Sequence, residues 1–232
     1  MKNIILKLFI AVIVVFTLYS CKKDYVTGGD LYQARVNMTT YDYLKTNHLF
    51  DTLVVMIDRT QLKEEVNQSG TLFALTNYAI SNYVKEKRDY LRIINNDENL
   101  VYTFDSLSVP TLRDSLRAYL FKDQLPLSTL TATGKLRRSN DGENRLIQAI
   151  PSNDYTNPNV FPVQPKYVYL TKIVKKEDGT GVIPTDSTQL NQVEPAQLLQ
   201  ARVQTSGIIT NTGIVHVLNN NHTFTFFGDK KN

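Results

Sequence analysis

Three histidines and one cysteine are the side chains of this 232-residue chain that most often carry chemistry in proteins. The histidines are His48, His216 and His222. No H-E-x-x-H motif, no G-x-S-x-G motif and no phosphate- or dinucleotide-binding glycine pattern accompanies them. His216 lies within an apolar run, which favours a buried structural residue, and two histidines without a third ligand do not make a zinc site. The sequence therefore predicts no catalytic residue, no metal and no cofactor, and we expect a protein that is not an enzyme.

Two short polar stretches, residues 95–99 and 140–144, are rich in the oxygen ligands that calcium prefers. Neither has the loop spacing that ends in a bidentate glutamate, so solvated turns are the favoured interpretation. Carboxylate pairs that hydrolyse glycosides need a defined separation in space, which a sequence does not give. An enzyme therefore ranks third, after the two non-enzymatic functions considered below. Two carboxylates facing each other across a deep cleft would support it.

Cys21 follows an N-terminal pattern that is typical of export signals. Two lysines precede an apolar run over residues 8–16, which is too short for a membrane-spanning helix of about 20 residues. The residues Leu18-Tyr19-Ser20-Cys21 resemble the lipobox of bacterial lipoproteins. The resemblance implies that residues 1–20 are removed as a signal peptide and that acylated Cys21, carrying for example palmitate, holds the protein to a membrane. The alternatives are an ordinary cleaved signal or an uncleaved anchor.

The cysteine count limits the disulfides that the chain can form, and its charge limits the classes of molecule that it can bind. Cys21 is the only cysteine, so no internal disulfide can form. The two lysines of the signal account for part of the net charge of +4, and without them the 26 basic residues fall to 24 against 22 acidic residues. No basic block occurs, which predicts no nucleic acid partner. We expect a cell-envelope protein, an outer-membrane lipoprotein whose periplasmic or outer face the sequence leaves open.

The periodicity of apolar residues changes halfway along the chain. In the first half, apolar residues recur at three- and four-residue steps, which predicts amphipathic helices. In the second half, short β-prone runs alternate with Gly, Asn and Pro clusters, which predicts strands and an α+β domain. The expected helices lie near residues 39–57, after Asn77 and from Pro110, and the expected strands are 71–76, 145–150, 166–174, 202–209, 213–218 and 222–227.

One domain is expected over residues 39–232. Residues 21–38 are polar and contain Gly28-Gly29, which predicts a flexible tether between the lipid and the domain. Two further polar stretches, near residues 138–144 and 177–194, have the composition of loop insertions.

Several segments resemble the fasciclin domain in the order in which that family has them. Residues 71–80 (TLFALTNYAI) are similar to its first conserved block and include Thr76 and Asn77. Residues 116–125 (LRAYLFKDQL) stand where the family has a Tyr-His segment, with Tyr119 for the tyrosine and Leu120 in place of the histidine. Residues 211–218 (NTGIVHVL) are similar to the second block and include Gly213 and His216.

This resemblance implies helices packed on a mostly antiparallel β-sheet or wedge-shaped sandwich. It implies that the motif residues matter to the fold, and local physics agrees: we expect Asn77 to cap a helix and Gly213 to allow a sharp reversal. It also implies non-enzymatic adhesion or binding of an extracellular glycan or protein, with the membrane contacted through the lipid anchor. The alternative is an accessory structural subunit of an outer-membrane glycan-uptake complex. Fold-level analogy does not identify a site.

A segment dense in Tyr, Asn and Pro, residues 152–170, is the one compositional candidate for ligand binding. Tyrosine offers an amphipathic contact surface, so Tyr155, Tyr167 and Tyr169 are the candidate residues. The favoured plainer interpretation is a loop ordered by prolines that leads into a strand, with Tyr167 and Tyr169 on one face.

Overall fold

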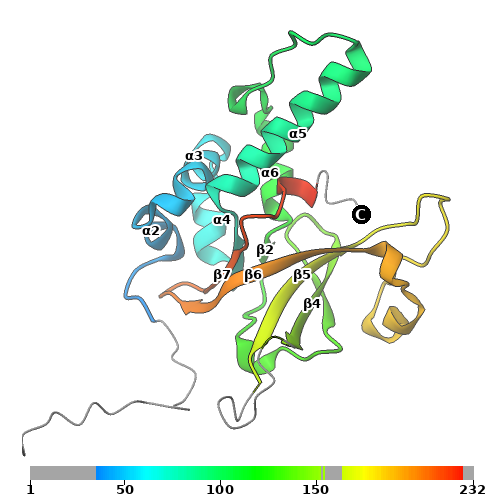
Figure 1. The fold of residues 1–232 in the computed structure, drawn as a ribbon. Helices are drawn as coiled ribbons and strands as arrows, with labels where there is room; N and C mark the ends of the chain where they lie inside the picture. Colours follow the sequence, from blue (N-terminus) through cyan, green and yellow to red (C-terminus); the bar gives the residue numbers. More distant parts are fainter. Residues whose placement is uncertain (1–34, 153, 155–163, 227–232) are drawn as a thin grey trace, which may run out of the picture. The chain divides into compact units, whose positions relative to one another are not determined.

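The computed structural model describes residues 35–152, 154 and 164–226, and these form an α+β fold (Figure 1). A seven-stranded, mostly antiparallel sheet is accompanied by helices, which confirms the predicted class. The α-helices are α2 (Thr40–Lys45), α3 (Asp51–Thr60), α4 (Lys63–Gln68), α5 (Asn77–Asn95) and α6 (Val109–Arg117). The strands are β1 (Thr71–Ala74), β2 (Leu120–Phe121), β3 (Lys135–Arg138), β4 (Asn144–Pro151), β5 (Lys166–Ile173), β6 (Leu198–Ile209) and β7 (Ile214–Leu218). Short 3-10 helices are η1 (His48–Phe50), η2 (Phe104–Ser106), η3 (Leu127–Thr129), η4 (Ser187–Gln192), η5 (Pro195–Gln197) and η6 (Phe224–Phe226).

The strand order is β2-β1-β7-β6-β5-β4-β3, and only the β1–β7 pair is parallel. Strand β6 serves both halves, because its first residues pair with β5 and its last residues pair with β7. Register shifts around Thr205 mark where this shared strand changes partner. The two ends of the sheet meet, since Phe121 bridges Ser139 and the Asn140 N–H donates to the Leu120 carbonyl at 2.8 Å. The sheet is therefore one nearly closed layer, which agrees with the expected mostly antiparallel sheet.

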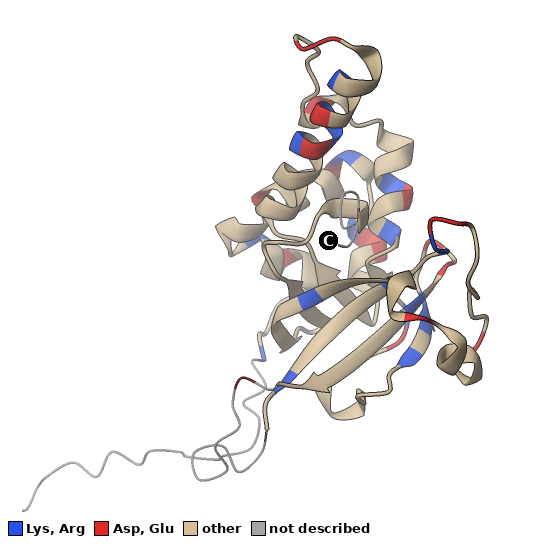
Figure 2. Cartoon of the chain, turned by 45° about the vertical axis from the view of Figure 1, so that its right-hand side comes forward, with Lys and Arg blue, Asp and Glu red and all other residues tan. Residues whose placement is uncertain are grey.

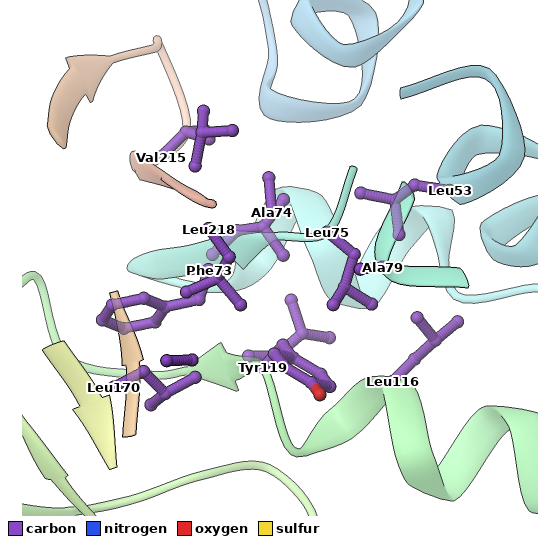
Figure 3. Close-up of a cluster of buried hydrophobic side chains, with 14 of the residues drawn as sticks. Leu53, Phe73, Ala74, Leu75, Ala79, Leu116, Tyr119, Leu170, Val215 and Leu218 are labelled. Atoms are coloured by element: carbon purple, nitrogen blue, oxygen red, sulfur yellow. The ribbon is translucent and has the colours of Figure 1, made fainter. Parts of the chain in front are cut away.

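Strand β1 is buried on both faces, which explains its unbroken apolar run. Phe73 points toward Leu170 of β5, whereas Leu75 just after the strand lies toward Ala79 of α5 and Leu116 of α6 (Figure 3). The core is continuous across these layers and includes Leu53, Met56 and Ile57 on the inner face of α3. Burial of this apolar surface is the main favourable term available to a fold that has no internal disulfide.

The predicted strand over residues 222–227 is wrong within the described part. Residues Phe224–Phe226 form η6, with left-handed backbone at Thr225 and Phe226. Side-chain packing overrides the β-prone composition here, because the Thr225 N–H donates to the buried Tyr119 hydroxyl at 2.9 Å and Phe224 stacks on the Tyr119 ring.

Other boundaries also differ from the expectation. The helix that starts near Pro110 ends at Arg117, and Leu120 begins β2 instead of continuing the helical face. Helix α4 and strands β2 and β3 were not predicted, since each is six residues or shorter and shows no clear period. The polar stretch 138–144 forms the turn between β3 and β4, and the stretch 177–194 contains η4.

The predicted tether is too long at its C-terminal end. Arg35 bridges Ile209, the Val36 N–H donates to the Ile209 carbonyl at 2.8 Å, and the Asn211 N–H donates to the Met38 carbonyl at 2.9 Å. Backbone hydrogen bonds thus hold residues 35–38 against the end of β6 and the β6–β7 turn. The predicted signal, Cys21 and the rest of the tether lie outside the described residues. Within the described ranges, no helix has the length and apolarity to span a bilayer.

Candidate functional site

The two blocks that resemble the fasciclin motif lie side by side. Strand β1 pairs with β7 in parallel register, so that Phe73 is opposite His216. Their rings stack at a centroid separation of 5.1 Å. These blocks are more than 130 residues apart in the chain, and their pairing forms the centre of the fold.

His216 is fully buried and fully hydrogen-bonded. Its Nε2–H donates to the Leu125 carbonyl at 2.9 Å, and its Nδ1 accepts from the Gly207 N–H at 3.2 Å. These two partners fix a neutral imidazole with one donor and one acceptor. Burial lowers the pKa of His216 to about 4, although the bond to the Leu125 carbonyl opposes the shift. The prediction of a structural histidine is confirmed, and the ring has no free position for chemistry.

Asn77 is a helix cap, but for a different helix from the one expected. It is the first residue of α5, and its Oδ1 accepts from the Thr52 N–H in the first turn of α3 at 2.8 Å. Its Nδ2 donates to the His48 carbonyl at 2.7 Å. Thr76 is the N-cap of α5 by position, yet its buried Oγ1 has no hydrogen-bond partner within the described chain. Asn77 therefore links the start of α5 to the start of α3, and the Thr76 side chain does not cap α5.

Tyr119 and Gly213 act through close packing. The Tyr119 hydroxyl hydrogen-bonds His222 Nε2 at 2.8 Å. Gly213 has an ordinary φ, and its necessity has another cause: a Cβ there would lie 2.5 Å from the Ser69 carbonyl oxygen. The reversal at this point is instead closed by Thr210, whose Oγ1 accepts from the Gly213 N–H at 3.0 Å.

Tyr167 and Tyr169 lie on the outer face of the sheet and are partly buried, while Val168 between them is fully buried. The guanidinium of the exposed Arg202 lies 4.8 Å from the centre of the Tyr167 ring. Tyr169 pairs with Gln148 on β4 and with Arg202 on β6. Two of the three predicted tyrosines thus share one accessible face with a cation. Tyr155 lies outside the described residues.

A polar cavity that sequence reasoning did not find lies between the end of α6 and the β3–β4 turn. We call it the hairpin cleft, with a volume of about 370 Å³. Arg145 on β4 is one of the lining residues, and its side chain is only 3% exposed and donates to Glu143 Oε2 and Asp141 Oδ2, each at 2.8 Å. The described lining residues are Asp114, Ser115, Ala118, Tyr119, Asp141, Glu143, Arg145, Lys172, Thr225 and Phe226.

A second polar cavity of about 460 Å³ lies next to the hairpin cleft along α6. Arg117 forms a two-nitrogen contact with the carboxylate of Glu65, at 2.9–3.2 Å, and Asn140 Nδ2 donates to the same carboxylate at 3.1 Å. The bonds to Glu65 raise the pKa of Arg117. Positively and negatively charged residues are interspersed along the helices and strands (Figure 2).

The sequence signal for the hairpin cleft was weak. Asp141 and Glu143 were noted only as parts of an oxygen-rich turn, and nothing local marks Arg145 as buried. A single charged residue, an arginine, in a mostly apolar strand and four residues after an aspartate was the available signal. Among the described residues, no group of three or more His, Cys, Asp or Glu is arranged to hold a metal.

Comparison of the chain with protein-family models and with curated protein sequences gives no match. The resemblance to fasciclin domains therefore rests on the sequence motifs of the chain alone.

Proposed function

We propose that the chain is a lipid-anchored, fasciclin-like protein of the bacterial cell envelope that binds an extracellular glycan or protein and does no chemistry. Support for the fasciclin-like fold comes from the parallel pairing of the two blocks and from the position of Tyr119 beside them, since the Phe73 N–H donates to the Tyr119 carbonyl at 2.9 Å. Support for the anchor comes from the lipobox-like residues that end in Cys21.

The observation that carries binding is the face formed by Tyr167, Tyr169 and Arg202. Tyrosine and arginine are the residues that most often dominate binding surfaces, because they bury a large area and still hydrogen-bond. Here the antiparallel pairing of β4, β5 and β6 holds them on rigid backbone. A rigid face loses little conformational entropy on binding.

A binding assay of the full-length chain against glycans and cell-surface proteins tests this proposal. The chain is displayed in liposomes through its lipid and mixed with labelled glycans on an array and with cell-surface extracts. We expect binding that the double change Tyr167→Ala and Tyr169→Ala weakens by about tenfold or more, equal to about 1.4 kcal/mol. Tyr78→Ala, at an exposed position on α5, is the matched control. Absence of binding to any glycan or envelope protein would contradict the proposal.

A second function, the accessory subunit of a glycan-uptake complex, is favoured by a different surface. The C-terminal part of α5 extends away from the sheet (Figure 1). Tyr90, Ile93 and Ile94 are exposed there at three- and four-residue spacing, which places them on one face of the helix, and Ile93 is 80% exposed. Scattered exposed apolar residues are normal, whereas an apolar cluster on a projecting element is typical of a protein contact.

Pull-down of the lipidated chain from native membranes separates the two functions. An accessory subunit should recover one envelope protein in stoichiometric amount, and Ile93→Asp should abolish that recovery. Val55→Asp, at an exposed position on α3, should leave it unchanged. Recovery of no stoichiometric partner would exclude the accessory function.

A further inference from the structure

We propose that strand β6 transmits mechanical force between the membrane tether and the binding face formed by Tyr167, Tyr169 and Arg202. The inference rests on the proposed function, because a lipid-anchored protein that holds an extracellular partner is pulled between its anchor and that partner. It goes beyond that function by stating how the fold withstands the pull. The key feature is the N-terminal clamp, which we define as the hydrogen bonds between residues 35–40 and residues 209–213 (Figure 1).

The backbone bonds of the clamp lie directly after the predicted tether. Arg35 forms a parallel bridge with Ile209, and the Val36 N–H donates to the Ile209 carbonyl at 2.8 Å. The Asn211 N–H donates to the Met38 carbonyl at 2.9 Å. A pull on residue 35 therefore reaches the end of β6 before it reaches α2, the next helix along the chain.

Side chains reinforce the clamp. Asn211 Nδ2 donates to Asn37 Oδ1 at 2.9 Å, and the Thr40 N–H donates to Thr212 Oγ1 at 2.9 Å. The hydroxyls of Thr40 and Thr210 hydrogen-bond each other at 2.9 Å, and these two residues are only 1% and 7% exposed. Hydrogen bonds are stronger in such a buried environment than in water. The clamp thus joins the start of the folded chain firmly to the β6–β7 turn.

Strand β6 continues from the clamp to the binding face. Arg202 lies earlier on the same strand as Ile209, and it pairs directly with Tyr169 on β5. The antiparallel ladder between β5 and β6 extends from this pair to the pair of Ile173 and Leu198. Force from the tether can therefore reach the binding face through one strand and its ladder, without passing through the helices.

The irregular part of β6 is held by a buried side chain. The register of β6 against β7 shifts between Val203 and Ile208. Within this stretch the Gly207 N–H donates to His216 Nδ1 at 3.2 Å, and the other ring nitrogen of His216 bonds the Leu125 carbonyl. His216 therefore fixes the place where the ladder between β6 and β7 is interrupted.

The alternative path for the force is mechanically weaker. Without the clamp, a pull on residue 35 would follow the covalent chain into α2, a helix of six residues. Short elements at the end of a fold open at low free energy, so the helices would separate from the sheet one after another. With the clamp intact, the helices and the binding face stay in place while the tether is under tension.

Optical tweezers test the inference by measuring how long the full-length chain stays folded at constant force. The chain is produced without export, so that Cys21 keeps a free thiol, and Gln200→Cys at an exposed position of β6 supplies the second attachment point. Pulling between residues 21 and 200 loads both the clamp and β6. In a Cys21→Ser chain, Tyr78→Cys on α5 replaces the first attachment point, and the force then bypasses the clamp.

We expect the double change Thr40→Val and Asn211→Ala to shorten the folded lifetime by about tenfold when the chain is pulled between residues 21 and 200. Thr60→Val is the matched control, because Thr60 is equally buried and its hydroxyl donates to the Met56 carbonyl within α3, outside the clamp. Pulling between residues 78 and 200 should give similar lifetimes for the double variant and Thr60→Val.

A double variant that lasts as long as Thr60→Val between residues 21 and 200 would overturn the inference. An equal loss in both pulling directions would also overturn it, because the clamp would then contribute only to overall stability. If the double variant does not fold, Asn211→Ala alone decides between the same outcomes, since it changes an exposed side chain. The measurement uses neither lipid nor ligand, so its failure leaves membrane anchoring and binding, which have their own tests, unaffected.

Discussion

At the scale of single residues, burial determines what His216 does. Its pKa is lowered to about 4, whereas an unfolded chain binds a proton near pH 6.5. Between these values the unfolded state holds more protons, so stability rises with pH in this window. The contribution of His216 is complete above about pH 6.5 and is lost as the pH falls toward 4.

We therefore expect the free energy of unfolding to fall by up to about 3 kcal/mol through His216 between pH 7 and pH 4. Carboxylates titrate in the same range, so the comparison is with His216→Gln, which should be less stable at pH 7 and show a flatter slope. Urea unfolding followed by circular dichroism at pH 4, 5.5 and 7 provides the measurement. Equal slopes in the two proteins would show that His216 does not titrate as its burial requires.

Substitutions at the neighbouring residues Thr76 and Asn77 should differ in their effect on the free energy of unfolding. Asn77→Ala removes the cap of α3 and the bond to His48, which should cost about 1–2 kcal/mol. Thr76→Val replaces a buried hydroxyl that has no partner in the described chain, so stability should be unchanged or slightly higher. Thermal unfolding of both variants gives the comparison, and a larger loss for Thr76→Val would contradict the assignment of the cap to Asn77.

At the scale of elements, the close approach of β7 to the start of β1 explains one glycine. A methyl group at residue 213 would lie 2.5 Å from the Ser69 carbonyl oxygen and 3.0 Å from that of Gly70. Both atoms are backbone, and the Gly70 carbonyl accepts from the Ile214 N–H at 2.9 Å, so neither can move without breaking the ladder.

Gly213→Ala should therefore destabilise the fold by about 2–3 kcal/mol. Gly179→Ala is the control, since residue 179 has open space around it and bears only the cost of its positive φ, about 1 kcal/mol. Chemical unfolding of both variants is the measurement. A Gly213→Ala variant as stable as the Gly179→Ala variant would mean that β1 and β7 can separate there at little cost.

Much of this element pattern was predictable from the sequence, because the longer helices and strands bury enough residues for their period to show. The strands at 144–151 and 166–173 and the helix after Thr76 were expected within a few residues. What failed had non-local causes. The two-residue strand β2 exists only because β1 lies beside it, and residues 224–226 turn because Tyr119 binds their backbone.

The candidate sites also differ in whether local sequence could predict them. Tyr167 and Tyr169 were predictable, since alternation in a strand places both on one face. The hairpin cleft was not, because Arg145, Lys172 and Ser115 come from β4, β5 and α6 and only the folded chain brings them together. The histidine that contacts Tyr119 likewise comes from residue 222, far from the tyrosine in sequence.

At the scale of the whole molecule, the lipid anchor and the folded domain can be tested independently. Cys21→Ser removes the thiol that the lipobox resemblance assigns to acylation. We expect the wild-type chain in the membrane fraction and the variant in the soluble fraction after cell lysis, with unchanged unfolding behaviour in both. A variant that stays with the membrane would contradict lipid anchoring through Cys21 and favour an uncleaved N-terminal anchor.

The position of β1 between β2 and β7 has a consequence for how the chain is made. One edge of β1 has no strand to pair with until residues 214–218 have been synthesised, long after β1 itself at residues 71–74. Such long-range pairing is slow to form. A nascent chain of this topology therefore lacks its β1–β7 ladder until β7 has been synthesised. For a protein proposed to be exported, this delay keeps the polypeptide unfolded, and so able to pass through a translocation channel, until it has crossed the membrane.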